Sequence, residues 1–213
     1  MARLAYRVLV LFAHPAFETS KINRRLAEAP QSLEGVTLRD LYQVYPDFDV
    51  DVEAEQDSLL EHDVVVFQHP LYWYSAPPLL KQWQDLVLEH GWAYGGGGNA
   101  LRGKLALHVT TTGASEATYA RGATNRFTLA EYLRPFESTA LLCGMHYLPP
   151  FAVHGTHGLS PAQTEAHVRD YRRLLVALRD STLDRARAAK VARLNAQLDA
   201  LIGSSPSTAS NGA

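Results

Sequence analysis

The chain has very little sulfur and no long apolar segment. Cys143 is the only cysteine among 213 residues, so the chain cannot form an internal disulfide, and it suits a reducing compartment. The longest apolar runs, such as residues 7–13, are far shorter than the roughly 20 residues that cross a bilayer. The run near the N-terminus is also short for a signal peptide and lacks a small-residue cleavage site. We therefore expect a cytoplasmic protein.

An excess of charge of either sign is also absent. The 20 Lys and Arg residues nearly balance the 22 Asp and Glu residues, which gives a formal net charge of −2. The basic residues are spread along the chain and form no stripe, which argues against a nucleic-acid partner. Residues 47–58 begin like a calcium loop but lack its glycine and its final glutamate. His154 and His157 have no third ligand at useful spacing, so we expect no metal.

Short apolar runs alternate with amphipathic segments along the chain. The apolar runs predict five strands, at residues 8–13, 36–41, 63–68, 104–110 and 145–153. Helices are predicted at residues 20–29, 53–61 and 126–142, and a further helix opens at Pro77-Pro78 with Ser75 as its cap. Such alternation is typical of an α/β fold in which helices cover both faces of a parallel sheet. We place this domain at residues 1–180.

Residues 160–213 extend the chain beyond the fifth strand. A long helix opens at the sequence SPAQ (residues 160–163), which has capping-box spacing. After a break near residue 180, residues 181–202 predict a second amphipathic helix, with an apolar seam of Val191, Leu194, Leu198 and Leu201. This seam suits packing on the core or on a twin helix. Residues 203–213 are small and polar, and we expect them to be disordered.

Three loops follow the first, third and fourth strands, and open parallel sheets bind ligands at this carboxyl edge. The first loop, AHPAFETSKIN, leads into a helix start, where free backbone N–H groups and the helix dipole favour an anion. The second, HPLYWYSAPP, carries flat aromatic side chains, and the third, TTTGASEATY, has small residues that let backbone N–H groups approach a ligand. Each loop alone also fits an ordinary cap, core segment or turn. Together they predict a site for a phosphate and a planar ring, which is the flavodoxin-like arrangement for flavin mononucleotide (FMN).

Several separated blocks of the sequence, among them AHPAFETSKINRRL, QHPLYWYSAPPLLKQW and VTTTGASEATY, resemble the NAD(P)H:quinone oxidoreductase flavoproteins. The resemblance implies a flavodoxin-like three-layer sandwich with a five-stranded parallel sheet of order 2-1-3-4-5. It also implies FMN, rather than FAD, as the cofactor. The residues that it assigns to the FMN phosphate and ribityl chain are His14, Ser20, Lys21, Ile22 and Asn23. Those that it assigns to the isoalloxazine ring are Leu71, Tyr72, Trp73, Tyr74, Thr111, Thr112, Gly113 and Ala114.

The same resemblance implies an enzyme that transfers two electrons in a ping-pong cycle. A hydride passes from NAD(P)H to flavin N5 and then to a quinone or another flat acceptor. Tyr119 matches the tyrosine of a Tyr–His pair in the animal enzymes, whereas the region of the histidine reads Thr124-Asn125. Tyr119 is therefore the one candidate catalytic side chain. The family is dimeric, and the regions that match those lining the site from the partner subunit are Trp92, Tyr94, residues 95–98 and Met145.

Two other functions stay open. The short bacterial branch of the family includes ancillary subunits of potassium-efflux antiporters. The chain is alternatively such a regulatory subunit, peripheral on the inner face of the cell membrane, with reductase activity secondary. A binding module without flavin is the third reading, which the intact loops disfavour.

Overall fold

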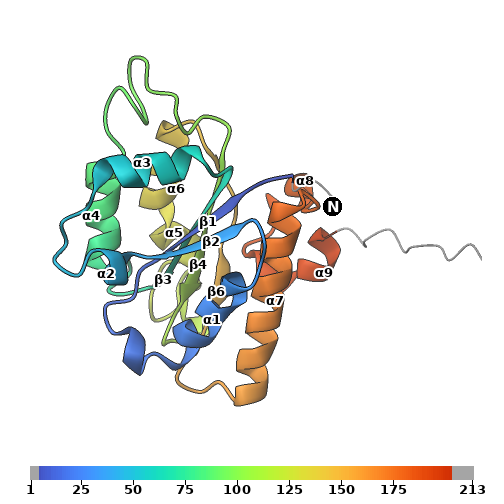
Figure 1. Cartoon of the computed structure of the whole chain (residues 1–213). Coiled ribbons are helices and arrows are strands. Elements are labelled where there is room, and N and C mark those ends of the chain that lie inside the picture. The colour runs from blue at the N-terminus through green and yellow to red at the C-terminus, as the bar shows by residue number, and fades with distance from the viewer. Residues whose placement is uncertain (1–4, 203–213) are drawn as a thin grey trace, which may run out of the picture.

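The computed structural model describes residues 5–202. Its centre is a parallel sheet with the strand order β2-β1-β3-β4-β5, and a sixth strand, β6, also pairs with β4 (Figure 1). The strands are β1 (Val8–Phe12), β2 (Val36–Asp40), β3 (Val64–Pro70), β4 (Leu105–Thr111), β5 (His146–Tyr147) and β6 (Phe151–Val153). Every residue of β1, β3 and β4 is buried, which explains their nearly continuous apolar runs. The predicted sheet order is confirmed.

The predicted fifth strand, residues 145–153, is divided in two. β5 pairs with the beginning of β4, where Leu105 is opposite His146, and β6 pairs with its end, where Val109 is opposite Phe151. The dipeptide Pro149-Pro150 precedes β6, and proline has no N–H to donate to a strand ladder. The prediction of one continuous strand was therefore wrong, although both pieces lie beside β4 as expected.

Helices cover both faces of the sheet (Figure 1). On one face, α1 (Lys21–Gln31) and α7 (Pro161–Arg179) pack in a core with Val8 and Val10. On the other, α3 (Val52–Leu60), α4 (Pro78–Val87) and α6 (Arg134–Leu142) pack in a core with Leu9 and Leu11. Successive residues of β1 thus point to opposite faces, as a strand requires. The other short elements of this part are α2 (Leu41–Val44), α5 (Leu129–Tyr132) and the 3-10 turns η1 (Phe17–Thr19) and η2 (Glu116–Thr118).

The predicted helix starts are confirmed for α1, α4 and α7, whereas the predicted cap of α4 is wrong. Ser20 caps α1, and Ser160 caps α7 in a capping box. Ser75 does not cap α4, which begins directly after Pro77. The backbone of Ser75 instead closes a turn with Tyr72, so the prolines start α4 without a side-chain cap.

Residues 181–202 do not form the predicted amphipathic helix. They contain the short helices α8 (Arg185–Ala188) and α9 (Leu198–Leu201) and the 3-10 turn η3 (Leu194–Ala196). Leu194, Leu198 and Leu201 are nevertheless buried in the core that α1 and α7 share with the sheet. Leu183 pairs with Ile202, so the segment closes on itself, which one straight helix cannot do. The tail that we expected to be disordered, residues 203–213, lies outside the described residues.

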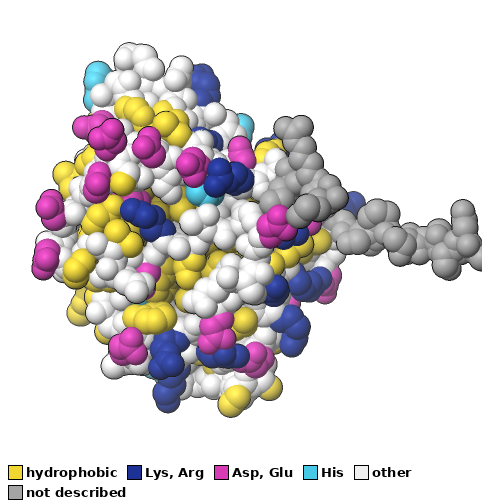
Figure 2. All heavy atoms as spheres, viewed as in Figure 1, with side chains coloured by type: hydrophobic (Ala, Val, Ile, Leu, Met, Phe, Trp, Pro, Cys, Tyr) yellow, Lys and Arg dark blue, Asp and Glu magenta, His cyan; other side chains and the backbone are white. Residues whose placement is uncertain are grey.

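The surface over α1 and α7 carries basic and acidic side chains intermixed (Figure 2). Arg25 of α1, for example, forms ion pairs with Glu28 and with Glu165 of α7. Exposed pairs of this kind contribute little to stability. Within residues 5–202, no helix combines the length and the apolar character that a membrane span needs.

Candidate functional site

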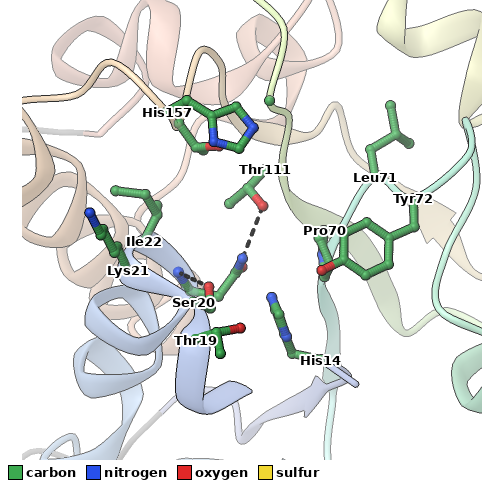
Figure 3. Close-up of a pocket in the computed structure, with 13 residues that line it drawn as sticks. His14, Thr19, Ser20, Lys21, Ile22, Pro70, Leu71, Tyr72, Thr111 and His157 are labelled. Atoms are coloured by element: carbon green, nitrogen blue, oxygen red, sulfur yellow. Dashed lines mark hydrogen bonds between the residues drawn. The ribbon is translucent and has the colours of Figure 1, made fainter. Parts of the chain in front are cut away.

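A cleft of about 490 Å³ opens at the carboxyl edge of the sheet (Figure 3). Its volume lies in the range of sites for small organic ligands. The lining residues are His14, Thr19, Ser20, Lys21, Ile22, Asn23, Pro70, Leu71, Tyr72, Thr111, Gly113, Thr156 and His157. Every predicted site residue of the first loop lines the cleft, whereas the second and third loops contribute only some of theirs.

The first turn of α1 forms one end of the cleft. The Ser20 side chain accepts the Asn23 N–H at 3.2 Å, and the N–H groups of Lys21 and Ile22 have no partner inside the helix. The Asn23 side chain donates to Thr111 Oγ1 at 3.1 Å. Asn23 Oδ1 is buried and has no hydrogen-bond partner among the described residues. The free N–H groups, the helix dipole and Lys21 favour an anion here, and Asn23 Oδ1 suits a hydroxyl of the same ligand.

His14 enters the cleft from just beyond β1 (Figure 3). Its Nδ1 accepts the Ala16 N–H at 3.1 Å, so the proton of the neutral ring is on Nε2. Burial lowers the pKa of His14, so the ring is neutral at pH 7. His14 can therefore offer a ligand an uncharged N–H donor.

Residues 72–75 form a tight reverse turn beside the cleft. Tyr72 and Ser75 exchange two backbone hydrogen bonds, of 3.0 and 2.9 Å. The two central residues, Trp73 and Tyr74, have positive φ angles of 48° and 63°, as a type I′ turn requires. Trp73 is 94% exposed, and Tyr74 stacks on a tyrosine of α5 with 4.7 Å between ring centroids. Leu71 and Tyr72 therefore line the cleft, and the two central aromatic residues do not.

Gly113 is the part of the third loop that lines the cleft next to Thr111. A Cβ atom on Gly113 would lie 2.8 Å from His157 Nε2, so glycine permits the close approach of the His157 ring. Thr112 is buried, and its hydroxyl donates to the Ala114 carbonyl at 2.8 Å. The Ala114 carbonyl also accepts the Gly155 N–H at 2.9 Å. Thr112 and Ala114 thus hold residues 154–157 against the third loop and do not line the cleft themselves.

Tyr119 follows η2 and lies outside the cleft lining. No histidine partner for it was expected from the sequence, but His154 lies beside it with 5.5 Å between ring centroids. His154 Nδ1 is 2.9 Å from Thr112 Oγ1, and because Thr112 donates its own proton to Ala114, His154 is the donor of this bond. Burial raises the pKa of Tyr119. Tyr119 is therefore protonated at neutral pH.

Several lining residues were not predicted from the sequence, namely Thr19, Pro70, Thr156 and His157. Thr156 and His157 follow β6, which runs parallel to β4 and ends at the same edge of the sheet. The rule that ligands bind beyond the carboxyl ends of parallel strands applies equally to this loop. It would have selected both residues. Among residues 5–202, no group of three or more His, Cys, Asp or Glu side chains is placed to hold a metal ion.

A buried histidine pair lies directly behind the cleft. His69 precedes the lining residue Pro70, and both His69 and His108 are 0% exposed. His69 Nδ1 donates to the Pro70 carbonyl at 3.0 Å, and His69 Nε2 accepts from His108 Nδ1 at 2.7 Å. Burial lowers the pKa of His69 to about 4, and burial also lowers that of His108. Both rings are therefore neutral at pH 7.

This pair should make the protein sensitive to acid. The unfolded chain binds protons on these histidines below about pH 6.5, whereas folded His69 does so only near pH 4. Stability is therefore complete above pH 6.5 and falls as the pH decreases to 4, by about 3 kcal/mol for His69 alone. Urea unfolding at a series of pH values measures this loss. His69→Gln should flatten the profile, replacing the exposed His146 by Gln should not, and a flat wild-type profile would contradict the prediction.

The regions predicted to face a partner subunit lie away from the cleft of their own chain. Trp92, Tyr94 and residues 95–98 belong to a long loop before β4. Trp92 and Tyr94 are partly buried and pack against the core that includes Leu9 and Leu11. Met145 is 6% exposed and lies in the core on the side of α6. None of them is among the residues that line the cleft, so any part in a site would need a second copy of the chain.

Known proteins share this fold over most of the chain. A family model described as flavodoxin-like fold matches residues 6–175. The glutathione-regulated potassium-efflux system ancillary protein KefF of Citrobacter koseri is 45% identical over 174 residues, which is 82% of this chain and 98% of that protein. General stress protein 14 of Treponema denticola, solved in complex with FMN, is 41% identical with a TM-score of 0.77, over 81% of this chain and 99% of that one. An NADPH-quinone reductase of P. pentosaceus is 36% identical with a TM-score of 0.73, over 79% of this chain and 96% of that one.

The family match begins before β1 and ends within α7. It therefore includes the whole sheet, both helical layers and all four loops around the cleft. Residues 181–202 lie beyond it. The resemblance seen in the sequence is confirmed, and the chain belongs to the flavodoxin-like NAD(P)H:quinone oxidoreductase family, together with the KefF ancillary proteins.

Proposed function

We propose that the chain is an FMN-dependent NAD(P)H:quinone oxidoreductase. The observation that carries the proposal is the cleft, which joins the free N–H groups of the first turn of α1 to the side chains of Leu71 and Tyr72. One end suits a phosphate and the other a flat ring, and a structural relative holds FMN. When bound, FMN would take a hydride from NAD(P)H and deliver it to a quinone.

The described residues fit the parts of FMN. The N–H groups of Lys21 and Ile22 would bind the phosphate, and neutral His14 would add a donor from Nε2. Asn23 Oδ1, buried and without a partner among the described residues, would accept a ribityl hydroxyl. The backbone of Gly113 would approach the pyrimidine end of the ring, where an N–H donor stabilises negative charge.

Tyr119 does not line the cleft, so its proposed role is separate from FMN binding. It holds its proton at neutral pH, and its ring lies against His154. We assign to it the delivery of a proton at the margin of the cleft. Tyr119→Phe should then lower kcat for quinone reduction without changing FMN affinity, and an unchanged kcat would remove Tyr119 from the mechanism.

The relatives suggest an alternative role and an assembly. KefF proteins are, by their name, ancillary to a glutathione-regulated potassium-efflux system, and the alternative proposal is that this chain binds such an antiporter at the inner face of the membrane. We also propose a homodimer in which the loop of residues 92–98 completes the partner's cleft. A dimer would give Trp73, 94% exposed in the single chain, an apolar neighbour. Sedimentation as a monomer would contradict the dimer, and failure to co-purify with a membrane transporter would contradict the alternative.

The test of the proposed function is the visible spectrum of the purified protein after incubation with FMN and desalting. We expect bands near ~375 and ~450 nm, where oxidised flavins absorb, that bleach when NADPH or NADH is added without oxygen and return when a quinone follows. Retained bands that neither nucleotide bleaches would contradict the reductase. A protein that stays colourless would contradict flavin binding and favour the binding module.

A further inference from the structure

The segment of residues 181–202 lies beyond the family match yet contacts the loops that build the cleft. Its side chains Ala188, Leu194, Leu198 and Leu201 are buried in the core beside α7. The segment also has polar contacts outside the core, and two of its residues, Arg193 and Asn195, reach loops or strands that are distant in sequence. Arg193 and Asn195 therefore link the segment to other parts of the chain.

Arg193 forms the first anchor, on the third loop. Its Nε donates to Glu116 Oε1 at 3.0 Å and its Nη2 to Glu116 Oε2 at 2.6 Å. Such paired bonds fix the direction of both groups as well as their distance. The Arg193 side chain is 23% exposed and the Glu116 side chain 60%, so the arginine is the more buried partner of the pair. Glu116 begins η2, immediately after the loop that carries Gly113 into the cleft.

Asn195 and its neighbour form the second anchor, on β6. The Asn195 side chain accepts the Ala152 N–H at 3.0 Å and donates to the Ala152 carbonyl at 2.8 Å. The Leu194 N–H donates to the Pro150 carbonyl at 2.8 Å. Since β6 pairs with β4 on its other side, Asn195 satisfies the free edge of β6 as a neighbouring strand would. The loop after β6 carries Thr156 and His157 into the cleft.

The two anchored loops form one wall of the cleft. Besides the bonds of Thr112 and Ala114 described above, the Thr156 N–H donates to the Thr112 carbonyl at 3.1 Å. The wall thus consists of the third loop and the loop after β6, which hydrogen-bond to each other. The C-terminal segment contacts the third loop through Glu116 and contacts β6 through Ala152. Displacement of either anchor would let the wall move relative to α1, whose Asn23 side chain donates to Thr111 Oγ1.

We propose that residues 181–202 are a clamp that positions this wall, and that Arg193 is a positioning residue for the ligand of the cleft. The identity of that ligand as FMN rests on the proposed function, whereas the ordering of the wall does not. A ligand that spans the cleft binds more weakly when one wall must be ordered on binding. The clamp therefore raises affinity without touching the ligand.

Arg193→Ala and Asp199→Ala form a matched pair of variants. Asp199 belongs to the same segment and pairs with Arg173 of α7, so its loss removes an ion pair of the segment but no contact with the wall. Amide hydrogen exchange without ligand should be faster at residues 113–119 in Arg193→Ala and unchanged there in Asp199→Ala. Quenching of FMN fluorescence should give a dissociation constant raised roughly three- to tenfold in Arg193→Ala only. Thermal unfolding should be similar in the two variants.

A charge exchange tests whether the anchor itself is responsible. Arg193→Glu alone should weaken FMN binding, and Arg193→Glu combined with Glu116→Arg should recover most of it. Equal exchange at residues 113–119 in Arg193→Ala and Asp199→Ala would overturn the clamp, as would a double variant no better than the single one. If the wild-type protein binds no FMN, the proposed function fails, and hydrogen exchange alone decides the clamp.

Discussion

Replacing Asn23 by aspartate is expected to weaken FMN binding about 1000-fold while leaving the fold intact. Aspartate has the shape of asparagine, and the Thr111 hydroxyl, 3.1 Å from the Asn23 side-chain nitrogen, can donate to it. The substitution therefore adds one negative charge and little else. The charge appears in the first turn of α1, beside the N–H groups that we propose for the phosphate.

The size of the effect follows from two competing responses. A carboxylate about 4 Å from a phosphate bound at the neighbouring N–H groups would be repelled by about 4 kcal/mol at an effective dielectric constant of ~20. The new carboxyl can avoid this by taking a proton, which costs an ordinary aspartate about 4 kcal/mol at pH 7. The two responses cost about the same free energy. We therefore expect the binding free energy of FMN to weaken by about 4 kcal/mol, or about 1000-fold in the dissociation constant.

Riboflavin provides the control, because it has the same ring and ribityl chain but no phosphate. Its affinity for the Asn23→Asp variant should fall by less than about tenfold, since only hydrogen bonds change. Fluorescence titration of both ligands with both proteins measures the difference. Equal losses for FMN and riboflavin would show that the phosphate does not bind at the start of α1.

Replacing Glu55 by alanine is expected to cause the largest loss of stability, about 3–5 kcal/mol. Glu55 of α3 is 0% exposed, and it accepts hydrogen bonds from Tyr45 Oη at 2.6 Å and from Trp83 Nε1 at 2.8 Å. It also pairs with the Arg39 guanidinium. The carboxylate thus joins β2, α3 and α4 in the core on one face of the sheet.

Alanine at position 55 would leave the Trp83 N–H and the Arg39 charge without their acceptor, and buried groups of this kind are costly when unpaired. Glu55→Gln keeps one acceptor oxygen and should cost less. The exposed Glu53 of the same helix provides the matched control, since Glu53→Ala should change the free energy of unfolding by no more than about 0.5 kcal/mol. Urea unfolding at pH 7 measures all three, and equal effects at the two positions would contradict the network.

Much of the fold follows from local patterns. Buried apolar runs identify β1, β3 and β4, and a serine directly before a helical pattern identifies the start of α1. Because all parallel strands end at one edge, these patterns also indicate where ligands bind. The loops that hold the first turn of α1, Tyr72, Thr111 and Gly113 were found in this way, whereas Leu71 came from the family resemblance. The predicted ligand of that edge is still a proposal.

Other features depend on contacts between residues far apart in the sequence. The turn of residues 72–75 directs Trp73 and Tyr74 away from the cleft, and an aromatic pattern cannot show which of its members face a ligand. Glu55 appears in the sequence as one more acidic residue of a helix. Its burial becomes evident only when Arg39, Tyr45 and Trp83 meet around it.

The sequence by itself determined the parallel sheet and the edge at which the cleft opens, because periodicity and helix caps are properties of neighbouring residues. Its ordered motifs identified the family, and the resemblance to that family implied the sheet order. Tertiary structure alone decided how the loops combine. His154 meets Thr112 and Tyr119, and Arg193 meets Glu116, across 42, 35 and 77 positions of the chain. Such contacts arise from packing between whole elements, and no local pattern records them, because each partner alone is compatible with an exposed position.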